Sequence, residues 1–119
     1  MFLKLFRQKE GTPYAAGQTV IAAGTKGDTM YIVLAGEVEI RAGDAALAVS
    51  GPGSIFGEMA LIDDEPRSAT VIARTDCRLL EVDRRRFEFM VSETPYFALA
   101  VMRVMADRLR KANARIASV

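Results

Sequence analysis

Short hydrophobic runs separated by glycine-containing turns dominate the first two thirds of the chain. In the segment 37–41 (EVEIR), Val38 and Ile40 alternate with charged residues, as in a strand with one buried face and one solvated face. Similar runs lie at 19–22, 30–34, 46–49, 69–74 and 78–82, and turn signals stand between them. Such closely spaced short strands predict a sandwich or a rolled barrel over about residues 15–82.

The period of the pattern changes after residue 82, and the remainder predicts helices over about residues 83–118. Asp83 is suited to cap a first helix, and Thr94 followed by Pro95 is suited to begin a second one. Along the second helix, apolar residues recur in steps of three and four at Ala98, Met102, Met105, Leu109, Ala112 and Ile116. We expect the first half of this stripe to pack on the β core, and the part beyond Leu109 to form a lid over a pocket or a self-association seam.

Composition narrows the class of protein. The 119 residues suit one domain, residues 1–119, and a hydrophobic share of 50% with 26% charged residues is typical of soluble globular proteins. A net charge of +1 favours neither nucleic acid nor an anionic membrane surface, and we expect the arginines at 84–86 to form a solvated helix face. Cys77 is the one cysteine, and no apolar run reaches about 18 residues. We therefore expect a cytoplasmic protein without membrane insertion.

The chain contains no histidine, which removes the commonest general base and the commonest metal ligand. The single cysteine and the scattered carboxylates show no spacing typical of a zinc site. We therefore expect no catalytic residues, no metal site and no enzyme activity.

One constellation of polar residues remains, in the segment 54–73 (SIFGEMALIDDEPRSATVIA). Gly57 allows a ligand to approach the backbone, and a short helix that starts at Glu58 would direct N–H groups at an anion. Arg67 offers a planar fork for phosphate oxygens, and Ser68 adds a hydroxyl. The segment predicts a phosphate between Arg67 and the helix, with a sugar hydroxyl on Glu58. A structural Glu58–Arg67 pair that only holds the loop is the alternative that these residues leave open.

The stretch FGEMALIDDEPRSATV closely resembles the phosphate-binding cassette of the cyclic nucleotide-binding domain family, which includes catabolite activator proteins, regulatory subunits of cAMP-dependent kinase and cyclic nucleotide-gated channels. GDTMYIVLAGEVEI resembles the family's early strand pair, and TPYFALAVMRVMADRLRKANARI resembles the long helix of bacterial members. The resemblance covers most of the chain from about Val20 onward. It implies a mainly β fold with flanking helices: an eight-stranded antiparallel β-roll (jelly roll), a short phosphate-binding helix and two C-terminal helices.

The resemblance also implies roles for individual residues. Glu58 would bind the ribose 2′-hydroxyl, and Arg67 would pair with the cyclic phosphate. The phosphate and ribose site would comprise Gly57, Glu58, Met59, Ala60, Arg67, Ser68 and Ala69. The base and lid residues would be Ile40, Val71, Arg108, Leu109, Ala112 and Asn113, with Ile40 and Val71 as an apolar floor. A hydroxyl at Ser68 can favour cGMP in this family, but many bacterial cAMP binders carry serine too, and we favour cAMP.

The implied function is a regulatory module that binds a cyclic nucleotide and signals through movement of its last helix, with no cofactor besides that ligand. Three residues follow Ile116, which leaves no room for the family's usual effectors. We therefore expect a separate protein effector, a homodimer through residues 102–116, or a chain cut from something larger. The alternative is a degenerate member that serves as a ligand-free scaffold or dimerisation module. Loss of Glu58 or Arg67 would mark such a member, and both residues are present.

Overall fold

The computed structural model describes residues 10–63 and 65–117, and the side chains up to residue 114. The chain divides into two compact units, Met1–Arg85 and Arg86–Val119. The first unit holds the strands and the second holds nearly all of the two long helices. That both units act as a single domain stays a prediction.

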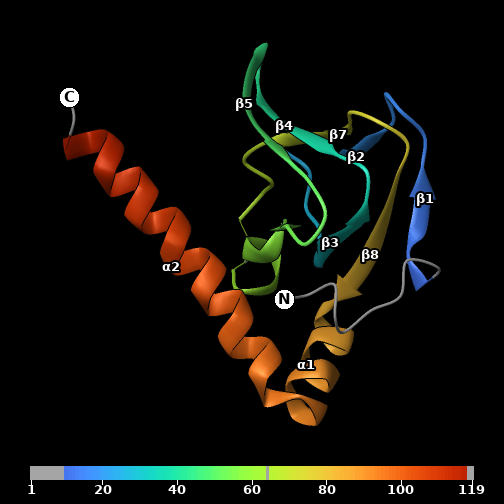
Figure 1. Cartoon of the computed structure of the whole chain (residues 1–119), viewed down its shortest axis with the longest axis vertical. Helices are drawn as coiled ribbons and strands as arrows, with labels where there is room; N and C mark the ends of the chain where they lie inside the picture. The colour runs from blue at the N-terminus through green and yellow to red at the C-terminus, as the bar shows by residue number, and fades with distance from the viewer. Residues whose placement is uncertain (1–9, 64, 118–119) are drawn as a thin grey trace. The chain divides into compact units, whose positions relative to one another are not determined.

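The first unit is built from two four-stranded antiparallel sheets (Figure 1). One sheet has the order β1-β8-β3-β6, and the other has the order β2-β7-β4-β5. The strands are β1 (Thr12–Tyr14), β2 (Thr19–Ile21), β3 (Thr29–Ala35), β4 (Val38–Ala42), β5 (Ala45–Ser50), β6 (Ile55–Phe56), β7 (Thr70–Ala73) and β8 (Cys77–Asp83). This architecture confirms the predicted mainly β fold with antiparallel strands and flanking helices.

Apolar residues from both sheets form a common core in the first unit. The second sheet contributes Val38 and Val71, and the first contributes Val33 and Leu79. The predicted buried face of β4 is confirmed, because Val38 is fully buried and Ile40 packs partly buried against the same core. The opposite face is only half-exposed at Glu39 and Arg41. Full burial of one such aliphatic side chain contributes about 1.5–3 kcal/mol, so this core is the main support of the roll.

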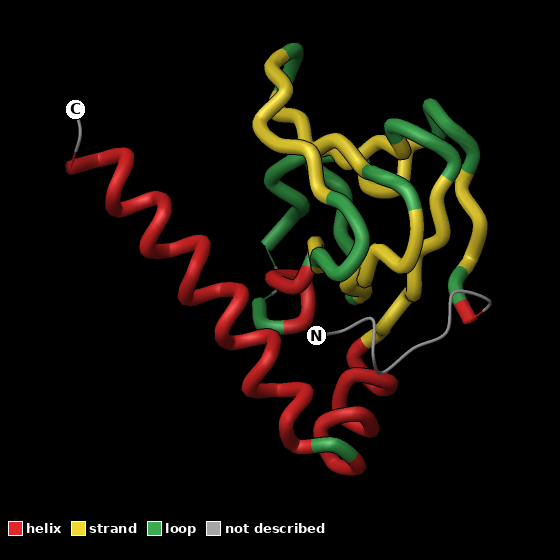
Figure 2. Tube along the Cα trace, in the orientation of Figure 1, coloured by secondary structure: helices red, strands yellow, loops and turns green. Residues whose placement is uncertain are grey.

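Two strands and one hairpin have features that the hydrophobic pattern did not indicate. β1 and β6 span three and two residues, which is too short for a period of two to be recognised. The β4–β5 hairpin extends away from the other strands at the top of Figure 2. Its outer strand β5 lies at the edge of its sheet and is exposed over nearly its whole length, with Leu47 and Val49 open to solvent.

The second unit contains most of α1 (Arg84–Glu93) and all of α2 (Pro95–Ala117). Pro95 is the first residue of α2, as predicted, and the Phe97 N–H donates to the Thr94 carbonyl at 2.8 Å. Within this unit, the Phe87 ring meets the Phe97 ring edge-on at 5.6 Å. On the polar side of α2, Lys111 and Asp107 form an ion pair at 3.0 Å.

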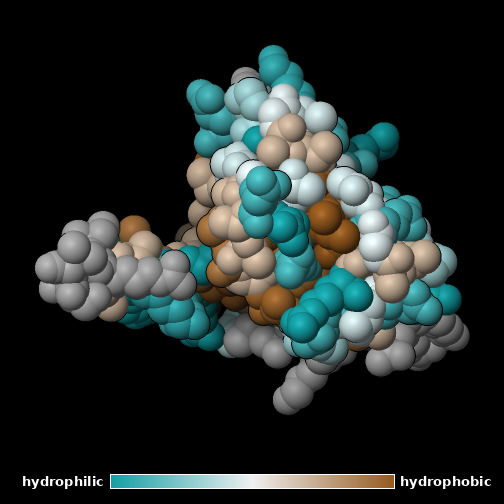
Figure 3. Space-filling model, turned by 90° about the horizontal axis from the view of Figure 1, so that it is seen from above, coloured by the Kyte–Doolittle hydropathy of each residue, from teal (hydrophilic) through white to brown (hydrophobic). Residues whose placement is uncertain are grey.

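The apolar stripe predicted on α2 is not the buried face of the helix, since Ala98 and Met105 are only half-buried. Its expected packing on the β core stays a prediction. Among the α2 side chains up to residue 114, those of Phe97, Ala100 and Val101 are buried, whereas Met102 is 57% exposed. Phe97 is much larger than Ala98, and together with residues 100, 101 and 104 it forms a second apolar face at helical spacing. Large hydrophobic residues thus remain at the surface among polar ones, as Figure 3 shows for one face of the molecule.

No helix in the described part of the chain is both long enough and apolar enough to cross a membrane.

Candidate functional site

Gly57 joins β6 to the short 3₁₀ helix η3 (Glu58–Leu61), which begins where the sequence predicts a short helix. Its φ of 76° lies in the left-handed region, where a residue with a side chain is strained. A Cβ at Gly57 would also lie 2.9 Å from Arg67 Nη1 and 3.2 Å from the Thr29 carbonyl oxygen. Glycine is therefore required here by the backbone conformation and by the close approach of Arg67.

Glu58 is the first residue of η3, and it is the buried charged side chain of the described residues, with 6% of its surface exposed. Burial differs between neighbouring side chains of the turn, since Ala60 is buried while Met59 is 52% exposed. A buried carboxylate is costly unless hydrogen bonds satisfy it. No buried side-chain nitrogen or oxygen in the described part of the chain lacks a partner. The side chain of Glu58 is therefore both buried and held by a partner.

Arg67 lies in the loop between η3 and β7, three residues before the strand begins. Its Nη1 donates to the Gly57 carbonyl at 2.9 Å, and its Nη2 donates to the Thr29 carbonyl at 2.7 Å. Its backbone is anchored as well, because its N–H donates to the Thr25 carbonyl and its own carbonyl accepts from the Gly24 N–H, both at 2.8 Å. The loop between β2 and β3 thus fixes the backbone N–H and the carbonyl of Arg67.

The partners of Arg67 bear on whether Arg67 and Glu58 form a structural pair. Among the residues that the structure describes, the guanidinium hydrogen bonds go to two neutral carbonyls, and no carboxylate forms an ion pair with it. A guanidinium has five N–H donors, of which these bonds use two. The positive charge of Arg67 is therefore held in place without being neutralised by any acidic side chain that the structure describes.

Two other residues predicted to bind the phosphate, Ser68 and Ala69, directly follow Arg67 in the chain. Ser68 is exposed and Ala69 is half-buried, and both lie in the bend that leads into β7. The predicted apolar floor is also brought together, since Ile40 on β4 and Val71 on β7 are direct cross-strand partners. Arg67, Ser68, Ala69 and the floor therefore all belong to the first unit.

The predicted base and lid residues of the last helix lie in the second unit. They are all exposed on α2, with Leu109 at 62%; the set is Arg108, Leu109, Ala112 and Asn113. Their part in covering a ligand stays a prediction.

Tyr31 and Phe56 are neighbours of the site that the sequence analysis missed. They are direct partners on β3 and β6, and their rings stack with centroids 5.0 Å apart. Burial is the main reason that the pKa of Tyr31 is raised; Glu81 raises it further, whereas the positive charge of Arg67 lowers it. The positive charge of Arg67 therefore acts on the Tyr31 hydroxyl and favours its ionised form. No spacing in the sequence could have paired these rings, because their contact depends on strands far apart in the chain.

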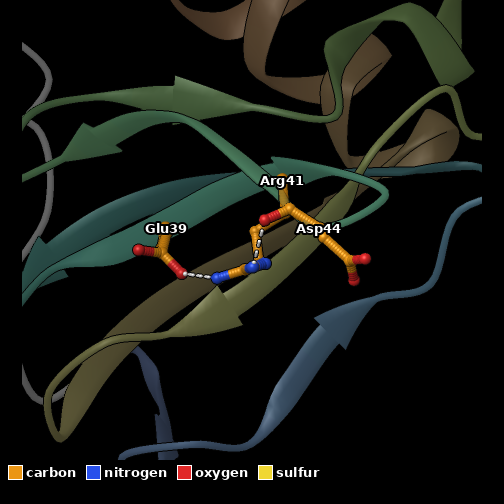
Figure 4. A network of polar contacts seen from close by, with 3 residues as sticks. All are labelled: Glu39, Arg41 and Asp44. Atoms are coloured by element: carbon orange, nitrogen blue, oxygen red, sulfur yellow. Dashed lines mark hydrogen bonds and ion pairs between the residues drawn. The ribbon is translucent and has the colours of Figure 1, made fainter.

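A second half-buried arginine, Arg41, lies on the β4–β5 hairpin (Figure 4). Its Nη1 forms an ion pair with Glu39 Oε2 at 2.8 Å, and its Nη2 donates to the backbone carbonyl of Asp44 at 2.8 Å. This arrangement joins the strand to the hairpin turn and neutralises the cation.

A cavity of about 620 Å³ opens elsewhere on the roll, lined by Pro13, Tyr14, Ala15, Gln18, Ala35, Asp76, Cys77 and Arg78. It contains none of the predicted site residues, and its charged groups already have partners. Asp76 accepts from the Ala16 N–H at 2.9 Å, and Arg78 donates to the Gly11 carbonyl at 2.7 Å. In the described residues, no group of three or more metal-ligating side chains comes together.

Comparison with known proteins gives three concordant findings. A family model for the cyclic nucleotide-binding domain matches residues 12–94. The CRP-like cAMP-activated global transcriptional regulator of Mycobacterium tuberculosis (strain ATCC 25618 / H37Rv) is 32% identical over 97% of this chain and 54% of its own length. The cAMP-dependent protein kinase regulatory subunit of Eremothecium gossypii is 45% identical over 60% of this chain and 16% of its own length.

A solved structure has a similar fold. The crystal structure of the Thermus thermophilus catabolite activator protein matches with a TM-score of 0.79 and 30% identity, over 92% of this chain and 55% of that chain. The chain therefore spans about half the length of these bacterial relatives.

Proposed function

The chain belongs to the cyclic nucleotide-binding domain family, and on this premise we propose that it binds cAMP, with the cyclic phosphate on Arg67 and the ribose 2′-hydroxyl on Glu58. The observation that carries the proposal is the state of the Arg67 guanidinium. Two backbone carbonyls orient it, and no described acidic side chain neutralises it. A phosphate would supply the missing negative charge.

The energy of such a contact is large enough to drive binding. Hydrogen bonds to charged groups contribute about 1.5–3 kcal/mol each, and a guanidinium can offer two parallel bonds to one phosphate. Because the carbonyls of Gly57 and Thr29 already hold Arg67, little side-chain entropy is lost when the anion binds. The phosphate contact should therefore dominate the affinity.

Glu58 suits the neutral part of the ligand. A carboxylate has about four acceptor positions on its two oxygens, so it can accept a ribose hydroxyl in addition to its existing partner. Its fixed place at the start of η3, next to Gly57, keeps it near the position proposed for the phosphate. The Gly57–Glu58 pair and the Arg67–Ser68–Ala69 bend together would hold the sugar and the phosphate, with Met59 and Ala60 completing the turn.

The choice of cAMP draws support from the relatives, which are named as a cAMP-activated regulator and a cAMP-dependent kinase subunit. The role of the chain is then that of a cytoplasmic regulatory module without catalysis of its own. Its signal would pass through α2, where Met102 and Leu109 are exposed and available to a separate effector or a second copy.

Isothermal titration of cAMP, cGMP and 5′-AMP into the purified chain tests the proposal. We expect saturable binding of cAMP, weaker binding of cGMP, and none of 5′-AMP, which lacks the cyclic phosphate. Affinity for cGMP about tenfold tighter than for cAMP would reverse the choice of purine. If neither cyclic nucleotide gives heat or a thermal shift, the ligand-free scaffold replaces this proposal.

A further inference from the structure

Gly27, in the loop between β2 and β3, faces the guanidinium of Arg67. A Cβ built on Gly27 would lie 2.8 Å from Arg67 Nη2, 3.1 Å from Nε and 3.3 Å from Cζ. All three of these nearest atoms belong to Arg67. Gly27 does not have the positive φ that six other glycines of the roll have, so its backbone conformation does not require glycine. The space occupied by Arg67 is what requires it.

We propose that Gly27 is a positioning residue for the phosphate site, a role that rests on the proposed function. The guanidinium lies in a slot with a glycine beside each terminal nitrogen: Gly57 beside Nη1 and Gly27 beside Nη2. The two carbonyls that accept its hydrogen bonds, those of Gly57 and Thr29, come from the same two segments. The missing side chain at position 27 lets Arg67 reach both carbonyls at once and sets the direction of its remaining donors.

A side chain at position 27 should displace Arg67 and leave the roll intact. The atom it would meet is the far end of a long flexible side chain, which moves more easily than backbone. A shift of several tenths of an ångström lengthens the 2.7 Å bond to the Thr29 carbonyl and turns the fork away from the phosphate. Affinity should therefore fall while the thermal stability changes little, and a larger side chain should act more strongly.

Gly51 offers a matched control. Like Gly27, it lies in a loop of the roll and has no positive φ, but a Cβ at this position would meet no heavy atom within 4 Å. Gly51→Ala therefore changes glycine content and chain entropy in the same way without touching the site.

The experiment measures cAMP affinity and thermal unfolding for the wild type, Gly27→Ala, Gly27→Val and Gly51→Ala. We expect Kd to rise about threefold to tenfold for Gly27→Ala, and more than about tenfold for Gly27→Val. Gly51→Ala should match the wild type. In an Arg67→Lys background, Gly27→Ala should have no further effect on affinity, because the group it displaces is gone.

A nucleotide-free measurement separates this inference from the proposed function. The ¹H–¹⁵N resonance of Arg67 Nε, identified by its loss in Arg67→Lys, should shift in Gly27→Ala and stay in place in Gly51→Ala. If the wild type does not bind cAMP, the proposed function fails, and the resonance still tests the slot. The inference is overturned if that resonance does not move, if both Gly27 variants bind cAMP like the wild type, or if their loss of affinity persists in the Arg67→Lys background.

Discussion

Two half-buried arginines of the roll, Arg41 and Arg67, have similar hydrogen-bond geometry but partners of different charge. Each donates from both terminal nitrogens, at 2.7 to 2.9 Å. Arg41 meets the carboxylate of Glu39, whereas Arg67 meets only carbonyls among the described residues. Arg41 is a structural tie, whereas in our proposal Arg67 keeps its charge for the phosphate of a ligand.

The difference lies in what each arginine still lacks. The Glu39–Arg41 pair is 24% and 30% exposed and already neutral, so it needs no further anion. Pairs that are this accessible typically contribute about 0–1 kcal/mol, and the value of this one lies in tying the hairpin turn to its strand. Two carbonyls orient Arg67, and no acidic side chain in the described part of the chain forms an ion pair with it. An anion gains more from Arg67 than from Arg41.

The largest expected effect comes from removing each arginine in turn. Arg67→Gln should weaken cAMP binding roughly a hundredfold, because it removes two charge-assisted hydrogen bonds of about 1.5 kcal/mol or more each. Arg41→Gln should leave the affinity within about twofold, since its charge is already paired. Isothermal titration of both variants measures the two values. An equal loss in both would show that general positive charge, and not the site around Gly57, attracts the nucleotide.

A smaller effect is expected from the two carboxylates. Glu58→Gln should weaken cAMP binding about tenfold, because an amide oxygen replaces a charged acceptor for the ribose hydroxyl. Glu39→Gln is the matched control and should not change the affinity, since Glu39 serves Arg41 on the hairpin. Repeating both titrations with 2′-deoxy-cAMP sharpens the test. The ribose assignment is wrong if Glu58→Gln weakens the deoxy ligand as much as cAMP.

The smallest effect concerns the titration of Tyr31. Burial raises its pKa above the usual 10, and Arg67 partly offsets that rise. Arg67→Gln should therefore raise the pKa of Tyr31 further, and Arg41→Gln should leave it unchanged. Because the folded pKa exceeds the unfolded one, the stability that neutral Tyr31 contributes is present below about pH 10 and is lost as the pH rises through the folded pKa.

The ring resonances of Tyr31 across the alkaline range give this value directly. A fall in the pKa of Tyr31 in Arg67→Gln, or an equal rise in both arginine variants, would contradict the placement of Arg67 beside this ring.

The features that could be predicted from the sequence are those set by neighbouring residues. The alternation of Val38 and Ile40, the turn at Gly57 and the start of α2 at Pro95 each depend on a few residues in a row. The resemblance of the whole cassette to a known family singled out Gly57 and Arg67 as two sides of one phosphate site, but not the hydrogen bond that joins the Arg67 guanidinium to the Gly57 carbonyl. Local patterns thus predicted the main elements of the fold, and a specific motif singled out the residues of the proposed site.

The features that could not be predicted depend on contacts between distant segments. Thr29 lies 38 residues before Arg67, and no spacing indicates that its carbonyl would hold the guanidinium. The sequence indicates only that Gly27 belongs to a turn. Its close approach to the guanidinium of Arg67 is visible only in the structure. On α2, Phe97 and Met102 lie on two apolar faces, and periodicity alone could not decide which is buried.

The most direct test is a cAMP titration of arginine-labelled protein followed by ¹H–¹⁵N correlation of the guanidinium groups, with assignment by Arg67→Lys and Arg41→Lys. Our account predicts that the Arg67 resonances move and saturate with cAMP and show coupling to the ligand phosphorus, while those of Arg41 stay in place. Arg67 resonances that do not respond to saturating cAMP would contradict the claim that this arginine binds the phosphate.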